Sequence, residues 1–286
     1  MENVTGIRVV RTLEELRRGT AEWRKNNESI ALVPTMGALH SGHMALVEAA
    51  TGAARRTVVS IFVNPAQFAP HEDLDRYPRD EAADLKRLDE HSVDLVWAPS
   101  VAEMYPDGFS TYVMPGSASQ GLETDFRPHF FQGVATVVLK LFNQVAPDLT
   151  FFGEKDYQQL AVVKQVARDL NLTVEVKGVP TAREKDGLAL SSRNVYLSPR
   201  EREIAPELYR VISDVAANAH SGDLSALAAE ATDKLTAAGF DKVDYVEIRD
   251  AETLSVFAAG SGRSGRVLAA AWLGRTRLID NVGILG

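Results

Sequence analysis

Short apolar runs alternate with amphipathic stretches as far as residue 175. The run 57–63 is rich in β-branched residues and is typical of a strand buried on both faces. Apolar positions three and four apart predict helices, and the stretch 134–145 shows this spacing most clearly. The predicted strands are 7–10, 29–33, 57–63, 93–97 and 149–152, and the predicted helices are 12–25, 44–54, 79–90, 134–145 and 156–169.

The alternation predicts an α/β fold, a doubly wound parallel sheet of the Rossmann-like kind, over residues 1–180. Beyond residue 180 the pattern changes. An alanine-rich helix at 224–238 is followed by β-like runs at 243–249, 267–273 and 277–281. We therefore expect a smaller α+β C-terminal lid domain over 181–286. Ligands of doubly wound sheets bind beyond the carboxyl ends of the strands, so the residues after each predicted strand are the first candidates for a site.

Composition narrows the possible functions. The chain of 286 residues has a formal net charge of −8 and a pI near 5.3, which disfavours a nucleic-acid surface. It contains no cysteine, which excludes disulfides, thiolate nucleophiles and cysteine-bound zinc. We find no apolar run long enough for a membrane helix and no signal-peptide pattern at residues 1–5. We therefore expect a cytoplasmic protein with small-molecule partners, without nucleic acid or membrane.

The most informative segment is Pro34-Thr35-Met36-Gly37-Ala38-Leu39-His40-Ser41-Gly42-His43. It reads as the end of a strand, a tight turn and the start of a helix. A helix N-terminus offers unpaired N–H groups that bind phosphate, and two imidazoles three residues apart add donors. The Rossmann glycine fingerprint and the Walker sequence are both absent here. Taken alone, the two histidines also fit a solvated helix end or a satisfied core pair.

Three further polar segments follow predicted strands or the expected domain boundary. Asn64 and Gln67 supply neutral amides suited to a hydroxyl or carboxylate ligand, although an Asn-Pro turn is the simpler interpretation. The segment 153–156 places a lysine beside a potential helix cap. The segment 191–193, Ser-Ser-Arg, could wrap a polyphosphate or could be a polar interdomain loop.

In this order, the segments 34–43, 62–68, 105–108, 152–160 and 191–194 resemble the pantoate–β-alanine ligase family, of the H-I-G-H-type nucleotidyltransferases. The resemblance covers nearly the whole chain. It implies an ATP-dependent ligase that condenses pantoate with β-alanine through a pantoyl adenylate and releases pyrophosphate and AMP. It also implies a homodimer and Mg²⁺ bound to the ATP phosphates.

The resemblance carries site roles to matching positions of this chain. The ATP site would comprise Met36, Gly37, Ala38, Leu39, His40, Ser41, Gly42, His43, Gly153, Glu154, Lys155, Asp156, Ala182, Leu190, Ser191, Ser192 and Arg193. The catalytic residues among them would be His40, His43, Lys155 and Arg193, with His43 as the proton donor. The substrate residues would be Asn64, Gln67, Gln159, Val134, Val137 and Val138, and Asp84 would be a metal ligand.

Two departures from the family pattern stand out. The family usually reads Arg-Pro-Gly-His-Phe before the apolar helix, whereas this chain reads Arg127-Pro128-His129-Phe130-Phe131. Phe130 therefore stands where the family's histidine is expected, and Phe cannot donate a hydrogen bond. The methionine that usually precedes Ser-Ser-Arg is Leu190, a swap of similar volume that a pocket should tolerate.

Other functions remain alternatives at this level. Another H-I-G-H-type adenylyltransferase would need extra basic residues for a phosphorylated acceptor, whereas Asn64, Gln67 and Gln159 are neutral. A nucleotide-sensing protein would not need the two histidines together with Lys155 and Arg193. A fragment of a class I tRNA synthetase disagrees with the negative net charge of −8 and with the lack of an anticodon-binding extension.

Overall fold

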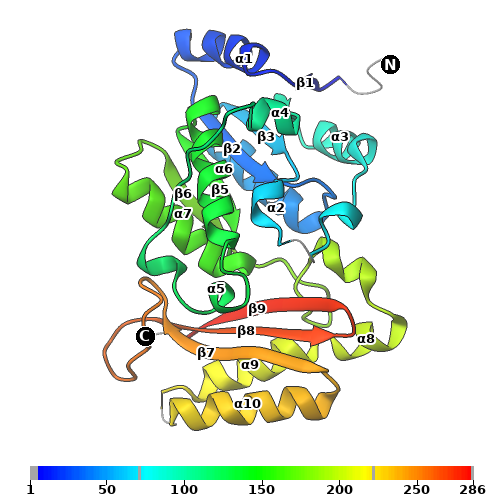
Figure 1. Ribbon diagram of the computed structural model, residues 1–286, viewed down its shortest axis with the longest axis vertical. Coiled ribbons are helices and arrows are strands. Elements are labelled where there is room, and N and C mark those ends of the chain that lie inside the picture. The colour runs from blue at the N-terminus through cyan, green and yellow to red at the C-terminus, as the bar shows by residue number, and fades with distance from the viewer. Residues whose placement is uncertain (1–5, 70–71, 221–222, 285–286) are drawn as a thin grey trace.

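The computed structural model describes residues 6–69, 72–220 and 223–284, in which a parallel sheet lies above an antiparallel one (Figure 1). The larger sheet has the order β1-β4-β3-β2-β5-β6 and all its pairs are parallel. Its strands are β1 (Arg8–Val10), β2 (Ile30–Thr35), β3 (Arg56–Ile61), β4 (Leu95–Trp97), β5 (Leu149–Gly153) and β6 (Glu175–Val179). From β2, strands β3 and β4 are added toward one edge of the sheet, whereas β5 and β6 are added toward the other edge.

Helices cover both faces of this sheet, and strand β2 shows why. Successive side chains of a strand point to opposite faces. Ile30 and Leu32 enter one core with helices α1 (Leu13–Lys25), α6 (Phe130–Val145) and α7 (Tyr157–Asp169). Ala31 and Val33 enter a second core with α2 (Ser41–Ala53) and α3 (Glu81–Glu90). The prediction of a doubly wound parallel sheet is confirmed.

The second sheet is antiparallel, with the order β7-β8-β9. Its strands are β7 (Lys242–Asp250), β8 (Gly265–Leu273) and β9 (Thr276–Ile284). Helices α9 (Glu207–Asn218) and α10 (Leu224–Ala238) lie below it in Figure 1 and share an apolar core with it, while α8 (Pro199–Ile204) lies at its side. The predicted smaller α+β part is thereby confirmed, and its upper face is turned toward the parallel sheet.

The remaining elements are short. They are α4 (Val101–Met104), α5 (Glu123–Phe126) and the 3₁₀ turns η1 (Pro65–Gln67), η2 (Leu74–Arg76), η3 (Ser117–Ser119), η4 (Glu154–Asp156) and η5 (Ser192–Tyr196). Within the described residues, none of the helices combines the length and apolar character that crossing a bilayer requires.

Two local differences from the sequence interpretation have clear causes. Strand β6 is absent from the predicted strands because it is a partly exposed edge strand whose polar residues interrupt its apolar positions. The pattern on α3 predicts that Ala82, Leu85 and Leu88 face inward, but Ala82 is exposed and Asp84 is buried instead. The hydrophobic pattern misses Asp84 because its buried partners are backbone amides from a distant turn.

Candidate active site

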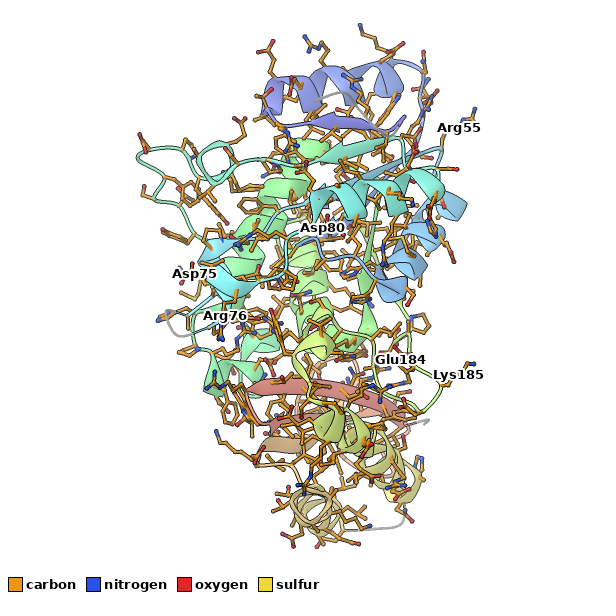
Figure 2. All side chains as sticks on the ribbon, turned by 90° about the vertical axis from the view of Figure 1, so that its right-hand side faces the viewer. Arg55, Asp75, Arg76, Asp80, Glu184 and Lys185 are labelled. Carbon is orange, nitrogen blue, oxygen red and sulfur yellow. The ribbon has the colours of Figure 1, made fainter. Side chains whose placement is uncertain are left out.

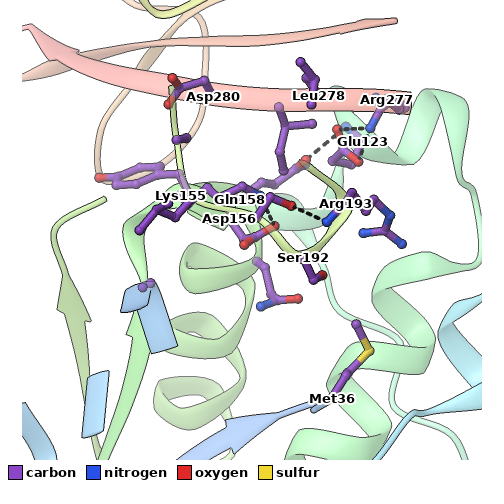
Figure 3. Close-up of a pocket in the computed structure, with 18 of the residues that line it drawn as sticks. Met36, Glu123, Lys155, Asp156, Gln158, Ser192, Arg193, Arg277, Leu278 and Asp280 are labelled. Carbon is purple, nitrogen blue, oxygen red and sulfur yellow. Dashed lines mark hydrogen bonds and ion pairs between the residues drawn. The ribbon is translucent and has the colours of Figure 1, made fainter. Parts of the chain in front are cut away.

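A large pocket of about 830 Å³ lies between the carboxyl ends of β2, β3 and β5 and the inner face of β8 and β9 (Figure 3). Figure 2 shows the two sheets from the side, with Glu184 and Lys185 at the outer surface of the molecule. The pocket is lined by all four segments that the sequence singled out, the histidine turn, the Asn64–Gln67 turn, the Lys155 turn and the Ser-Ser-Arg loop. Parallel strands therefore bring the first three segments to one edge, as expected, and the Ser-Ser-Arg loop reaches the pocket from beyond β6.

The turn after β2 is held in shape by Asp84. Gly37 and Ala38 have φ values of 79° and 52°, so the backbone adopts the left-handed conformation twice in succession. Asp84 accepts hydrogen bonds from the N–H groups of Ala38 at 2.9 Å and Leu39 at 2.7 Å. Burial raises the pKa of Asp84, and these two hydrogen bonds oppose the rise. The Asp84 carboxylate thus stabilises a turn whose left-handed residue Ala38 is conformationally strained.

The structure gives the Asp84 carboxylate another use, as the acceptor for two backbone amides, and its expected metal role stays a prediction. Asp84 is 3% exposed and does not line the pocket. Within the described ranges, no group of three or more His, Asp or Glu side chains is arranged to hold a metal ion. Several residues expected in the ATP site are not part of the pocket lining. These residues are Gly37, Ala38, Leu39, Ser41 and Glu154.

His40 and His43 cap helix α2 together. His40 is the N-cap residue, and its Nδ1 accepts from the N–H of Gly42 at 3.1 Å. The Nδ1 of His43 accepts from the N–H of His40 at 3.3 Å, and the two ring centroids lie 4.1 Å apart. A side-chain Cβ at Gly42 would stand 2.9 Å from the His40 ring, so glycine permits this cap.

The capping geometry fixes the protonation of both rings. An Nδ1 that accepts from a backbone N–H carries no proton, so each neutral imidazole carries its proton on Nε2. Burial, with a smaller contribution from Lys155, lowers the pKa of His40 to about 4. Burial and the neighbouring His40 lower the pKa of His43 to about 3. At neutral pH the pocket therefore holds two neutral Nε2–H donors at a helix N-terminus.

Two cations complete this side of the pocket. Lys155 lies in η4 directly after β5, with its Nζ 3.7 Å from a carboxylate oxygen of Asp156. Arg193, from η5, forms an ion pair with Asp73 in which Nη2 and Nε lie 2.9 and 3.2 Å from the two carboxylate oxygens. The Ser192 hydroxyl lies 3.3 Å from the hydroxyl of Tyr77. Figure 3 shows Lys155, Ser192 and Arg193 around one cavity.

Asn64 supports Gln67 from behind. Its Nδ2 donates to Gln67 Oε1 at 3.0 Å and to the carbonyl of Gly133 at 3.2 Å, and its Oδ1 accepts from the Tyr105 hydroxyl at 2.7 Å. Asn64 is 1% exposed and uses its amide within the protein. Gln67 is left with its Nε2 facing the pocket, 3.1 Å from the sulfur of Met36. Both residues line the pocket, but the Asn64 amide is occupied within the protein, whereas the Gln67 Nε2 has, among the described residues, only the Met36 sulfur as its partner.

Helix α6 supplies an apolar wall through Val134, Val137 and Val138. At its start, Phe130 lines the pocket beneath the Arg127 guanidinium, which lies 3.8 Å from the ring centroid. His129 is exposed and does not line the pocket. The displaced histidine therefore does not substitute for the one that the family pattern places at residue 130.

The structure also brings residues to the pocket that the sequence did not indicate. Arg277 of β9 donates to both carboxylate oxygens of Glu123, at 2.9 and 2.7 Å, and the Tyr245 hydroxyl donates to Glu123 at 2.7 Å. Figure 3 shows the ion pair between Glu123 and Arg277. Glu123 and Arg277 are 154 positions apart, and no local pattern marks either of them.

Fold and site define the class of this protein. It is an α/β protein with a doubly wound parallel sheet, whose pocket at the carboxyl ends of the strands combines a histidine-capped helix N-terminus with neutral amides. The sequence profile described as pantoate-beta-alanine ligase matches residues 8–283. The chain belongs to the pantoate–β-alanine ligase family.

Individual relatives agree with this assignment. A pantothenate synthetase from Mesorhizobium japonicum is 53% identical over 280 residues, which cover 96% of this chain and 97% of that protein. A crystal structure of pantothenate synthetase from Thermus thermophilus is 47% identical, covers 98% of this chain and 100% of that one, and has a TM-score of 0.91. A Francisella tularensis pantoate-beta-alanine ligase complexed with beta-gamma ATP and beta-alanine is 32% identical, covers 97% of both chains and has a TM-score of 0.80.

Proposed function

We propose that this chain condenses pantoate with β-alanine, using ATP, through a pantoyl adenylate. The observation that carries the proposal is the division of the pocket. One side holds Nε2–H donors, a helix N-terminus and the cations Lys155 and Arg193, and the other holds Gln67, Gln159 and the valines of α6. The first side suits a polyphosphate, and the second suits a small hydroxy acid with an apolar body.

In the first step, a pantoate carboxylate oxygen attacks the α-phosphorus of ATP and the bond to pyrophosphate breaks. His40 and His43 donate Nε2–H hydrogen bonds to phosphate oxygens, and His43, in the position that the resemblance gives to the proton donor, hydrogen-bonds the leaving pyrophosphate and keeps its own proton. Lys155 and Arg193 offset the negative charge that develops on the phosphates. Gln67 and Gln159 orient the acid, and the valines exclude water from its apolar part.

In the second step, the amine of β-alanine attacks the acyl carbon of the adenylate. The bond to AMP breaks, and the amine loses its proton to water. No residue of the enzyme forms a covalent intermediate, in keeping with a chain that contains no cysteine. The chain contributes by holding the reactants and stabilising phosphate charge.

We propose that Mg²⁺ arrives with ATP, bound to phosphate oxygens and water, where it would neutralise phosphate charge. The described residues contain no cluster of three suitable ligands, so phosphate and water oxygens would supply most of its coordination. Asp84, expected as a metal ligand, is buried under the turn and accepts from two backbone amides. We further propose a cytoplasmic homodimer in which residues 181–286 act as a lid domain over residues 1–180.

The test measures pyrophosphate release. Release is expected to need ATP and pantoate together, and AMP and pantothenate to appear only after β-alanine is added. ATP turnover that depends on neither pantoate nor β-alanine would refute the proposal. His43→Ala is expected to lose the first step while remaining folded, and His129→Ala, at an exposed position outside the pocket, serves as its control.

A further inference from the structure

A buried asparagine of the C-terminal sheet contacts the turn that carries Lys155. Asn281 on β9 is 4% exposed, and its Nδ2 donates to the carbonyl oxygens of Glu154 at 2.8 Å and Lys155 at 2.9 Å. An amide nitrogen has two hydrogens, so each carbonyl receives one. Two consecutive peptide groups of η4 are therefore held by a residue that lies 126 positions beyond Lys155.

The orientation of the Asn281 amide is fixed by Arg266. The Nη1 of Arg266 donates to Asn281 Oδ1 at 2.6 Å, its Nη2 lies 3.3 Å from the Glu154 carboxylate, and its guanidinium lies 3.7 Å from the Tyr157 ring centroid. A guanidinium only donates hydrogen bonds, so the amide oxygen must face it and the amide nitrogen must face the turn. The hydrogen bonds between Asn281 and the η4 carbonyls therefore require this one orientation of the amide.

The backbone of Asn281 is fixed as well. Its N–H donates to Asp280 Oδ1 at 2.7 Å, and Asp280 in turn accepts from both terminal nitrogens of Arg183 at 2.6 and 2.9 Å. Figure 3 shows Asp280 on β9 directly above the Lys155 turn. The asparagine thus projects from a rigid strand.

The turn itself depends on such an external contact. Neither η4 nor the start of α7 has a side-chain cap, and a three-residue 3₁₀ turn has little stability of its own. The Lys155 side chain is 19% exposed and lines the pocket, so a shift of its peptide groups would move Nζ relative to the ligands.

We propose that Asn281 is a positioning residue for Lys155, so that the antiparallel sheet completes the active site by fixing a catalytic turn of the parallel sheet. This inference rests on the role proposed above for Lys155. Because positioning errors near 1 Å have large kinetic effects, Asn281→Ala is expected to lower kcat for pyrophosphate release about 10- to 100-fold. The KM for pantoate should change little, because Gln67 and the α6 valines are untouched.

A double-mutant cycle tests whether Asn281 acts through Lys155. In a Lys155→Ala background, the further change Asn281→Ala should cost nothing more, because the group that it positions is absent. Independent, multiplying losses would overturn the proposal. Asn281→Asp keeps the shape but turns an oxygen toward both carbonyls, so it should lose as much as Asn281→Ala. Asn218→Asp makes the same change at an exposed site on α9 and should leave kcat unaffected.

Hydrogen exchange supplies a readout that does not depend on activity. Peptides covering residues 150–160 should exchange faster in Asn281→Ala, while peptides from β3 should not change. Unchanged exchange in 150–160 would refute the positioning contact by itself. Full activity of Lys155→Ala would instead refute the role proposed for Lys155, and with it the kinetic part of this inference.

Discussion

Arg193 and Asp73 form a two-point ion pair between the Ser-Ser-Arg loop and the segment that precedes η2, with Nη2 2.9 Å and Nε 3.2 Å from the carboxylate oxygens. The pair is only partly exposed, since the two side chains retain 31% and 17% of their accessible surface. Asp73 therefore forms an ion pair with the same guanidinium group that we propose to bind the ATP phosphates. A phosphate ligand has to compete with this carboxylate.

Removing the competing charge should strengthen ATP binding. Asp73→Asn leaves the shape of the side chain but weakens the ion pair, so the KM for ATP is expected to fall about 3- to 10-fold, as expected for a partly buried pair. Initial rates at varied ATP concentration measure the effect. Asp75→Asn, an equal charge change at an exposed position, should leave the KM unaltered. A higher KM in Asp73→Asn would show that the pair helps to order the ATP site.

Stability should depend on pH through the two capping histidines. Their pKa values of about 4 for His40 and about 3 for His43 lie below the ordinary 6.5, so the unfolded chain binds more protons than the folded chain in this range. Their contribution to stability is complete above about pH 6.5 and is lost as pH falls toward 4, with a slope of about 1.4 kcal/mol per pH unit for each proton.

The variant His43→Gln isolates one of these protons. Its free energy of unfolding should fall less steeply than that of the unaltered chain between pH 6.5 and pH 4, because one buried group no longer has to be charged. Urea unfolding at several pH values gives both slopes. His129→Gln, at an exposed position, should behave like the unaltered chain. Parallel pH curves for His43→Gln and the unaltered chain would disprove the explanation.

Gly133 sets the distance between α6 and the Asn64–Gln67 turn. A Cβ at this position would stand 2.2 Å from the carbonyl oxygen of Ala66, so Gly133→Ala has to push η1 away from the helix. We expect a loss of about 1–3 kcal/mol in the free energy of unfolding. The KM for pantoate should also rise, because Asn64 bonds to the carbonyl of Gly133.

Gly52 provides the matched comparison for this change. It lies in α2, and a Cβ there meets nothing within 4 Å. Gly52→Ala should therefore raise the free energy of unfolding by about 0.5–1 kcal/mol through helix propensity alone. Thermal or urea unfolding of the two variants measures the difference in sign. Equal effects would mean that the contact with Ala66 is not close enough to matter.

The role assigned to Asp84 is also open to a direct test. Asp84→Asn keeps one acceptor oxygen but turns an NH₂ group toward a backbone amide, so the variant should lose about 1–3 kcal/mol of stability. The Mg²⁺ concentration for half-maximal activity should not change. Asp89→Asn, on the exposed side of α3, is the control. A large shift in Mg²⁺ dependence with unaltered stability would instead identify Asp84 as a metal ligand.

Local features of the site are readable from the sequence because their partners are close along the chain. His40 and His43 are three residues apart at a helix start, and Asn64 and Gln67 share one turn. Strand-to-helix alternation then places these segments at one edge of a parallel sheet. The hydrogen bonds of Asp84 are not readable in this way, because an acidic residue on a helix gives no sign that its partners are the amides of Ala38 and Leu39 in a distant turn.

The sequence by itself determined the doubly wound sheet, the family and the segments that meet in the pocket, since periodicity and contiguous motifs are local properties. Tertiary structure alone decided which polar groups face the ligands. The Asn64 amide forms hydrogen bonds to the backbone and to Tyr105. Glu123 pairs with Arg277, and the Lys155 carbonyl accepts from Asn281, each across more than one hundred residues. Such pairings arise from the stacking of two sheets, which fixes distances and leaves no periodic trace along the chain.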